Sequence, residues 1–480
     1  MAKRSGSFAD AVGTAATIAR PLPASRRAAF RWPLVALGCT ALAALSLLVS
    51  RQTTYDPTAW LIWGRETVHG DLSTVAGPSW KPLPIVVTAP AALLGDAAQQ
   101  QVWLVFARAG ALAALVLTYR LAWRLAGPVA GVVAAGALLA SSSFASRMFR
   151  GNSEGILLAL AIGAIEAHRV GRRRTAFALL VGTALLRPEM CLFAAAYALW
   201  LARTAPDLRR RVSTLAVTGA AGGLIVAAWL VPEKIGSGDW LRAASRALEP
   251  VAGSPATAAH PFLATFSTAA PVVAWPIYAT AIVLVAQAAF EARRTRRWSL
   301  PLALAALATA VMVVVAAMAE GGFTGNPRYL TIPIALTCVL GAAGATHLVI
   351  AARSWPPRRR AIAVGSLAAV IAAPFVGYTV VRTVDEVSDG LHESALYAAL
   401  PDAISRAGGR AAMLRCGTPI TAWFDTQAVA RALHVHERQV AITARIPGTL
   451  ISRQGSAMAH DGRYPPVAQT DGWVIGSSCR

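Results

Sequence analysis

The chain has 480 residues, 56% of them hydrophobic and only 14% charged, with a mean hydropathy of +0.52. A soluble protein carries about 25% charged residues, so the composition excludes an ordinary soluble globular protein. The formal net charge of +22 could indicate nucleic-acid binding, but residues 383–480 are neutral, with nine arginines against nine acidic residues. The excess charge therefore belongs to the apolar part of the chain, and we expect no nucleic acid partner.

Residues 1–31 are polar and basic, and an apolar run follows over residues 32–50. A signal peptide is one interpretation of this pattern. However, the run is long, and the residues before Arg51 lack a small-x-small cleavage site. The sequence therefore predicts a cytoplasmic segment over 1–31, followed by an uncleaved first membrane helix.

Further apolar runs recur along the chain, and a membrane crossing needs about 20 residues. Together with the first helix they predict a polytopic α-helical membrane protein with about 11 transmembrane helices, within a membrane domain over residues 32–382. The later runs cover residues 102–125, 128–145, 154–169, 174–186, 189–203, 212–231, 269–290, 299–319, 328–352 and 361–381.

Arginine clusters orient these helices. With the N-terminus inside, the clusters at 172–174, 209–211, 293–297 and 358–360 all fall in inside loops, as the positive-inside rule requires. We therefore predict a multi-pass protein of the plasma membrane with its N-terminus cytoplasmic. The outside segments are then 51–101, about 146–153, 232–268, 320–327 and 382–480.

Two predicted outside segments have their own structure. The long first loop, 51–101, contains a short helix over 58–69, and an apolar, proline-rich stretch over 83–94 that is too short to span comfortably. The tail, 383–480, is predicted to be a small extracytoplasmic α/β domain, with helices at 393–407 and 421–435 and strands at 411–416, 440–451 and 473–475. Outside the cell, Cys416 and Cys479 could form a disulfide.

Ionisable residues near a membrane are costly and often functional. Asp56 follows the first helix, and its carboxylate could act as a general base or hold a divalent ion; an ordinary helix N-cap is the alternative. Glu66, Asp71 and Lys81 lie further along the same loop.

Three further clusters lie in the predicted outside segments or at their edges. Arg147, Arg150 and Glu154 share one helical face by their spacing. Arg187-Pro188-Glu189 breaks a helix, since proline removes a backbone donor. Arg328 follows a glycine-rich loop, between Asn326 and Tyr329, and suits a phosphate because its planar fork donates paired hydrogen bonds. Each cluster could instead be structural: an interfacial ion pair, a broken helix, or a headgroup anchor.

These clusters, in this order, resemble the GT-C superfamily of multi-spanning glycosyltransferases, which includes protein O-mannosyltransferases and aminoarabinose transferases. The resemblance covers about residues 32–352 and rests on Asp56, the Lys81 loop, the 150–154 and 186–189 motifs, and the run from Asn326 to Leu330. It implies a polyprenyl-phosphate sugar donor and a catalytic acidic residue in the first outer loop.

One departure from the superfamily concerns the catalytic position. Many members have two adjacent acidic residues there, whereas Pro57 follows Asp56. A second carboxylate could come from Glu66 or Asp71, which are candidates for binding the acceptor or a metal, or it could be absent; a divalent cation is therefore possible but the metal is unknown.

The hypothesis from sequence is an inverting glycosyltransferase (a hexosyl- or pentosyltransferase) at the outer face. Asp56 would be the base, and Arg328, Arg150, Arg187 and Lys81 would bind the donor phosphate. Glu154, Glu189, Asn326 and Tyr329 would support them. The acceptor would be an envelope glycan, lipid or protein, beside membrane lipid. The main alternative is a transporter or flippase of an envelope lipid or glycan precursor; a module acting through its tail ranks last.

Overall fold

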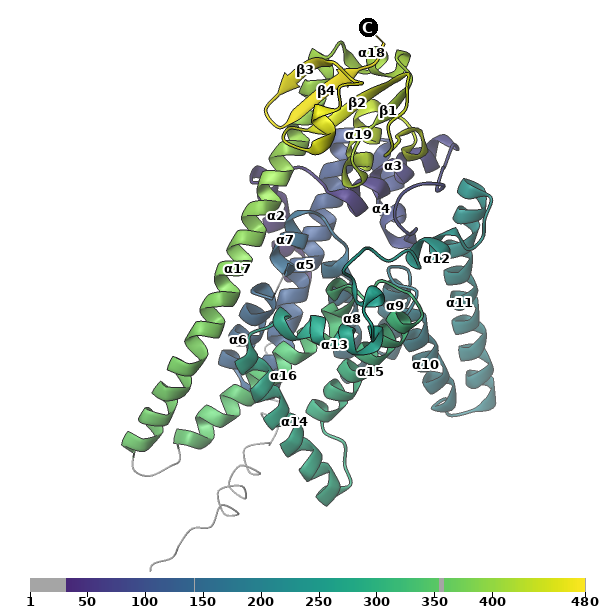
Figure 1. Cartoon of the computed structure of the whole chain (residues 1–480). Helices are drawn as coiled ribbons and strands as arrows, with labels where there is room; N and C mark the ends of the chain where they lie inside the picture. The colour runs from purple at the N-terminus through teal and green to yellow at the C-terminus, as the bar shows by residue number, and fades with distance from the viewer. Residues whose placement is uncertain (1–31, 142, 354–357, 480) are drawn as a thin grey trace, which may run out of the picture.

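The computed structural model describes residues 32–141, 143–353 and 358–479. The chain forms a helical bundle with a small sheet-containing domain at its C-terminal end (Figure 1). The predicted cytoplasmic segment 1–31 and residues 354–357 of the last predicted inside loop lie outside the described residues.

The bundle helices follow one another with short connections. In chain order they are α2 (Trp32–Leu45), α3 (Tyr55–His69), α4 (Pro82–Ala92), α5 (Asp96–Ala126), α6 (Pro128–Leu139), α7 (Phe144–Phe149), α8 (Glu154–Arg169), α9 (Arg173–Ala184), α10 (Met190–Arg203), α11 (Leu208–Ser237), α12 (Arg242–Ala247), α13 (Pro261–Ala269), α14 (Trp275–Thr295), α15 (Leu300–Glu320), α16 (Thr331–Arg353) and α17 (Arg358–Arg406).

Among the described residues, six helices are long and apolar enough to cross a membrane. They are Asp96–Ala126, Leu208–Ser237, Trp275–Thr295, Leu300–Glu320, Pro327–Ala352 and Ala368–Arg406. Shorter apolar helices include α2, α4, α6 and α10. The predicted total of about 11 spans stays a prediction, because spans such as 174–186 form helices well below the roughly 20 residues that a crossing needs.

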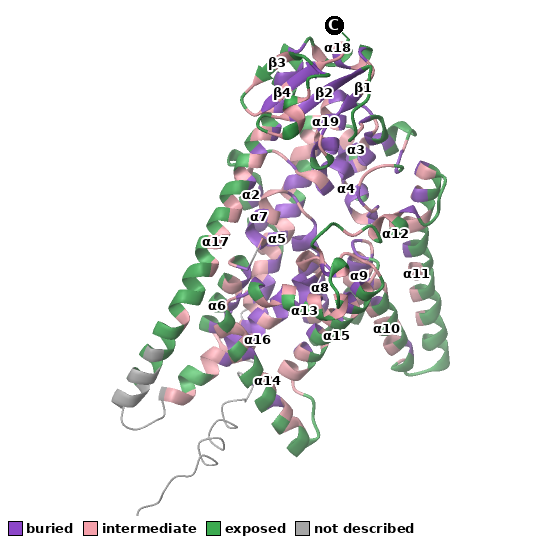
Figure 2. Ribbon diagram, viewed as in Figure 1, coloured by how far each residue is buried: buried purple, intermediate pink, exposed green. Residues whose placement is uncertain are grey.

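The outer faces of the bundle are apolar. Figure 2 shows α11 and α17 exposed along much of their length, and their exposed side chains include Leu224 and Ile371. Exposed apolar surface of this extent is unusual for a soluble monomer and suits contact with lipid. The buried core lies between α3, α4, α5, α8 and α16, where α8 approaches α5 closely: a Cβ on Gly155 would lie 2.5 Å from the Cβ of Ala111.

The helix predicted over 58–69 is confirmed as α3, which begins at Tyr55 and ends at His69, followed by the C-cap Gly70 with φ of +73°. The short apolar stretch predicted over 83–94 is α4, and it packs against protein. Gly64 of α3 permits this packing, because a Cβ there would lie 2.5 Å from Oγ1 of Thr88. The break predicted at Arg187-Pro188-Glu189 is also confirmed, since α9 ends at Ala184 and α10 begins at Met190.

The C-terminal domain contains a four-stranded sheet in the order β1-β2-β4-β3. The strands are β1 (Thr418–Ile420), β2 (Gly448–Arg453), β3 (Pro466–Thr470) and β4 (Trp473–Ser477). β1 is parallel to β2, and the other pairs are antiparallel. Two short helices accompany the sheet, α18 (Gly409–Arg415) and α19 (Thr426–Leu433), and Cys416 is bonded to Cys479.

Several predictions for this domain were wrong. The strand expected at 411–416 is helix α18, which agrees with its run of strong helix formers, Ala, Met, Leu and Arg. The helix expected at 421–435 shortens to α19, and the strand expected from 440 begins only at Gly448. The helix expected at 393–407 is the last part of α17, which continues without a break through the predicted domain boundary at 382.

Candidate functional site

Asp56 is the centre of a buried charged cluster. It lies in the first turn of α3, and its side chain is only 10% exposed. Nη1 of Arg328 donates a hydrogen bond of 2.8 Å to Oδ2 of Asp56, and Nζ of Lys81 lies 3.9 Å from the same oxygen. The helix N-cap is Thr54, not Asp56, so the alternative role of Asp56 as an N-cap does not apply.

The two cations determine the charge of this carboxyl. Burial by itself would raise the pKa of Asp56, but the positive charges of Arg328 and then Lys81 outweigh burial, and the pKa lies below its usual value. Asp56 is therefore ionised at neutral pH. It is available to accept a proton without first losing one.

Lys81 precedes the first helical residue of α4, Pro82, which fixes it at the start of that helix. Its ammonium group lies 4.8 Å from the ring centroid of Trp60 on α3, within the range of a cation–π contact. Burial and the nearby Arg187 lower the pKa of Lys81 to about 8. Lys81 is therefore a cation at neutral pH that loses its charge in mildly alkaline solution.

Arg328 is held by its neighbours in sequence. The side chain of Asn326 accepts a hydrogen bond of 3.0 Å from the backbone N–H of Arg328, which caps the short 3-10 turn Pro327–Leu330 before α16. The guanidinium of Arg328 lies 5.3 Å from the ring centroid of Tyr329. Asn326 and Tyr329 thus both contact Arg328, and their supporting role stays a prediction.

A second buried pair adjoins the first. Nη2 of Arg187 donates to Oε1 of Glu154 at 3.3 Å, and both side chains are 4% exposed. The guanidinium of Arg187 also lies 4.1 Å from the ring centroid of Tyr329. Tyr329 therefore contacts Arg187 and Arg328 and joins the two pairs into one cluster.

The cluster has unused hydrogen-bonding capacity. Oε2 of Glu154 and Nε of Arg328 are buried and have no hydrogen-bond partner among the described residues. Buried polar atoms without partners are rare in folded proteins. The two atoms mark a place where a polar ligand or water would complete the hydrogen bonding.

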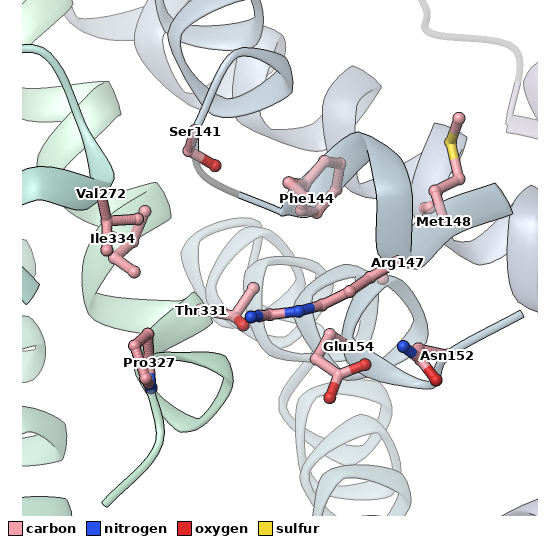
Figure 3. Close-up of a pocket in the computed structure, with 12 residues that line it drawn as sticks. Ser141, Phe144, Arg147, Met148, Asn152, Glu154, Val272, Pro327, Thr331 and Ile334 are labelled. Carbon is pink, nitrogen blue, oxygen red and sulfur yellow. The ribbon is translucent and has the colours of Figure 1, made fainter. Parts of the chain in front are cut away.

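Arg147 of α7 reaches into a small cavity of about 20 Å³ beside Glu154, which has room for a water molecule. Figure 3 shows its guanidinium extending between Thr331 and Glu154. Burial lowers the pKa of Arg147, while Glu154 opposes that change. Arg147 has no ion-pair partner within 4 Å among the described residues, so its charge is available to an anion.

In total, the cluster contains four cations, Lys81, Arg147, Arg187 and Arg328, and two carboxylates, Asp56 and Glu154. Its formal charge is therefore +2, and its members come from α3, α4, α7, α8, the α9–α10 break and the loop before α16. Such a group can bind a doubly charged phosphate through charge-assisted hydrogen bonds while presenting a carboxylate beside it.

Other residues predicted for the site lie elsewhere. Nη1 of Arg150 is 3.3 Å from Oε2 of Glu393 on α17, so Arg150 does not join the cluster and Arg147 takes the place predicted for it. Glu189 makes no ion pair with a described residue. The sequence placed Arg147 and Arg150 on one face, but it could not show which of the two would point at Glu154.

Glu66 and Asp71 were predicted as a second carboxylate beside Asp56, and the structure does not bring them there. Oε1 of Glu66 lies 2.7 Å from Nδ1 of His436, and its Oε2 accepts from the backbone N–H of Ser73. Oδ2 of Asp71 lies 3.8 Å from Nε2 of the same histidine. Both carboxylates thus connect the 51–101 segment to the C-terminal domain.

The arrangement around Asp56 does not fit a divalent cation. A cation site would need several oxygen or nitrogen ligands, whereas two positive side chains already hold this carboxylate. No group of three or more His, Cys, Asp or Glu side chains suited to a metal occurs in the described part of the chain. We therefore place no divalent cation at Asp56.

No protein-family model matches the sequence, and no curated protein is significantly similar to it. Solved structures do match. ArnT from Cupriavidus metallidurans, bound to undecaprenyl phosphate, aligns with a TM-score of 0.55 and 14% identity over 94% of this chain and 98% of that chain; its apo state aligns with a TM-score of 0.54 and 15% identity over the same shares.

An oligosaccharyltransferase from Archaeoglobus fulgidus, tethered to an acceptor peptide, aligns with a TM-score of 0.50 and 13% identity. That match covers 88% of this chain and 69% of the other. At these identities the likeness shows the fold and not the reaction. At the level of the fold the resemblance predicted from the sequence is confirmed: this chain shares its overall fold with ArnT and with the archaeal oligosaccharyltransferase.

Proposed function

We propose that the protein is a membrane glycosyltransferase that moves a sugar from a polyprenyl-phosphate donor to an envelope acceptor. The observation that carries this proposal is the buried Asp56 carboxylate held by Arg328 and Lys81 within a cluster of net positive charge. Fold likeness to ArnT, whose structure holds undecaprenyl phosphate, supports the same donor class. A flippase without chemistry would not need a carboxylate at the centre of its phosphate site.

The reaction is a single displacement. An acceptor hydroxyl attacks the anomeric carbon of the donor sugar, the bond from that carbon to the phosphate oxygen breaks, and the configuration inverts. Asp56 takes the hydroxyl proton, and the leaving lipid phosphate keeps the electron pair. Arg328, Lys81, Arg147 and Arg187 stabilise the negative charge that develops on the phosphate.

The Asp56–Arg328 ion pair gives donor binding a second effect. A phosphate that binds Arg328 competes with Asp56 for the guanidinium, so the carboxylate loses part of the charge that lowers its pKa. Asp56 becomes a stronger base when the donor is present. Asp56 is therefore a weaker base before the donor binds and a stronger base once the donor phosphate is bound.

The surroundings of the reaction follow from the predicted topology. With the N-terminus cytoplasmic, the cluster lies at the outer face of the plasma membrane, where a polyprenyl phosphate presents its sugar. The C-terminal domain lies on the same side, and its disulfide suits that compartment. The acceptor would be a glycan, lipid or protein of the envelope.

The test is a transfer assay on the purified protein in lipid, with radiolabelled polyprenyl-phosphate sugars and an envelope-lipid extract. Asp56→Asn should lower turnover by about 10² to 10⁴, the usual share of general base catalysis. Glu249→Gln is the matched control, because Glu249 also pairs with an arginine, Arg246, but its side chain is 65% exposed. Full activity in Asp56→Asn would refute the proposed base.

A second measurement separates catalysis from transport. Lipid flipping in reconstituted vesicles that survives Asp56→Asn, together with no transfer from any donor by folded wild-type protein, would favour the transporter alternative. Transfer that disappears only in Asp56→Asn, and not in Glu249→Gln, would establish both the reaction class and the residue.

A further inference from the structure

Helix α17 runs alongside α7, the short helix that bears Arg147. Gly390 marks the closest approach: a Cβ at this position would lie 3.0 Å from Nε of Arg150 and 3.1 Å from Oγ of Ser146. About one helical turn further along α17, Glu393 pairs with Arg150 at 3.3 Å. Thr383 also donates to the backbone carbonyl of Ala140, at the end of α6, at 2.9 Å. Helix α17 therefore fixes the α6–α7 region at several points.

Glu393 is shared between this contact and the C-terminal domain. Its other carboxylate oxygen, Oε1, lies 3.5 Å from Nη2 of Arg453 on β2. Arg453 in turn donates from Nε to both carboxylate oxygens of Asp425 at 2.9 Å, and Asp425 is 1% exposed. Tyr397 of α17 completes the group, donating to Asp425 at 2.9 Å. An unbroken chain of charged contacts thus runs from α7 into the domain.

At its Asp425 end, this series of contacts leads back to the helix that bears Asp56. Phe424 immediately precedes Asp425, and its ring packs edge-on against the ring of Tyr55, with 5.6 Å between centroids. Tyr55 immediately precedes Asp56. Helix α19, which follows Asp425, packs on α3 as well. The C-terminal domain therefore touches both the helix that bears Asp56 and, through Glu393, the helix that bears Arg147.

We infer that Arg150, Glu393, Arg453 and Asp425 form a clamp that sets the position of Arg147 relative to Asp56. The inference rests on the proposed function, because it gives these residues a positioning role in that reaction. The clamp replaces the phosphate-binding role that the sequence suggested for Arg150. It also gives the C-terminal domain a task at the site without requiring it to touch the substrate.

The physical reason for such a clamp is the geometry of group transfer. The phosphate cations and the base must act on the same sugar in a fixed relative arrangement, and displacement of a group by about 1 Å can lower the rate 10²-fold. Helix α7 has only six residues, too few to fix its own orientation in the bundle. Contacts outside α7 must do so: the carboxylate of Glu386 accepts from the backbone N–H of Ser143 at the start of α7, and Arg150 at its end pairs with Glu393.

The experiment measures donor KM and kcat separately for Arg150→Ala, Glu393→Gln, the double variant and Arg150→Lys. Asp402→Asn is the matched control, since Asp402 pairs with Arg406 on the same helix at 3.0 Å but both side chains are more than half exposed. We expect each single variant to lower kcat by about tenfold or more, with little change in donor KM. The kcat of the double variant should be no lower than that of the less active single variant. Arg150→Lys should keep most of the wild-type kcat.

Three kinetic outcomes would overturn the clamp. If Arg150→Ala raises donor KM while Glu393→Gln does not, Arg150 binds the phosphate directly. If the effects of the two single variants simply multiply in the double variant, the residues do not act as one unit. Wild-type rates in all variants would also refute it.

A structural measurement keeps the clamp separate from the reaction. Amide hydrogen exchange over residues 144–153 should be faster in Glu393→Gln than in Asp402→Asn, whether or not a donor is known. Unchanged exchange would overturn the clamp even if the enzyme is active. Absence of transfer from every donor, with faster exchange in Glu393→Gln, would refute the proposed function and leave the clamp standing.

Discussion

Arg328 donates a 2.8 Å hydrogen bond to Asp56 across 272 positions of sequence. Each residue belongs to a different motif, one after the first predicted helix and the other after a glycine-rich loop, and the fold joins them in a buried site. The pair holds a carboxylate and a phosphate-binding cation in mutual contact. Two further predictions concern the charged site around this pair, and two concern the C-terminal domain.

The first concerns Arg328. Arg328→Ala should lower turnover by 10² to 10³, as removal of one stabilising donor does in other enzymes, and should weaken binding of polyprenyl phosphate. Arg328→Lys should recover only part of both, because an ammonium group cannot contact Asp56 and Tyr329 with the same fork. Turnover and equilibrium binding of the lipid phosphate are the measurements, with the exposed Arg406→Ala as control. Undiminished lipid binding in Arg328→Ala would contradict the assignment.

The second prediction is an alkaline limit set by Lys81. The pKa of Lys81 is about 8 without bound donor. Because kcat/KM reports the free enzyme, it should fall as the pH rises through 8. A bound phosphate favours the charged ammonium, so the fall in kcat should come at higher pH. Lys81→Arg keeps its charge at every accessible pH and should abolish the alkaline limb. The same limb in both proteins would show that another group titrates.

The third prediction concerns Glu437, which is buried where the C-terminal domain meets Gly77. Burial raises the pKa of Glu437 to about 7, although Arg242 opposes the change. The folded state thus holds a proton that the unfolded state releases above its ordinary pKa of 4.5. Stability from this group is complete below that value and is lost as the pH rises through 7.

Glu437→Gln mimics the protonated acid and should remove that loss. Thermal unfolding of the full chain in detergent should show wild type and variant alike near pH 4.5, and the variant more stable at pH 8 by at most about 3 kcal/mol. The pKa of Glu66 is raised as well, and its charge contributes to the raised pKa of Glu437, so the difference reports Glu437 together with its interaction with Glu66. A variant that is less stable at pH 8 would contradict the prediction.

The fourth prediction concerns the bond between Cys416 and Cys479, which closes a loop of 63 residues. On the chain-entropy estimate, such a loop contributes about 4 kcal/mol. Cys479→Ser should lower the unfolding temperature of the C-terminal domain, and a reducing agent should do the same to the wild type but not to the variant. Unfolding followed by hydrogen exchange over residues 410–479 would locate the effect. If reductant changes the unfolding temperature of both proteins equally, the disulfide does not provide this stability.

Much of the local structure could be predicted from the sequence. Proline and glycine marked the ends of α3, α4 and the α9–α10 break, because their backbone restrictions act within a few residues. The order of Asp56, Lys81, Arg187 and Arg328 along the chain indicated the fold and one charged site. These signals are local, or depend on residue type alone.

The pairing of distant charges could not be predicted. Glu66 is ten residues from Asp56, yet its partner His436 is 370 positions away, and nothing in the 51–101 segment reveals that choice. Arg147 and Arg150 are separated by less than one helical turn, so the rotation of a six-residue helix decides which faces Glu154. Such rotations are set by packing with α17, which belongs to another part of the sequence.

Helix α17 has a consequence for how an acceptor reaches the site. It contains 49 residues, about 74 Å at 1.5 Å per residue, and it enters the C-terminal domain without a joint. The helix contains Pro374 and Pro401 and still runs from the membrane part of the chain into the domain as one element. The domain also packs directly on α3, so under the proposed function an acceptor must reach Asp56 around the domain and not beneath it.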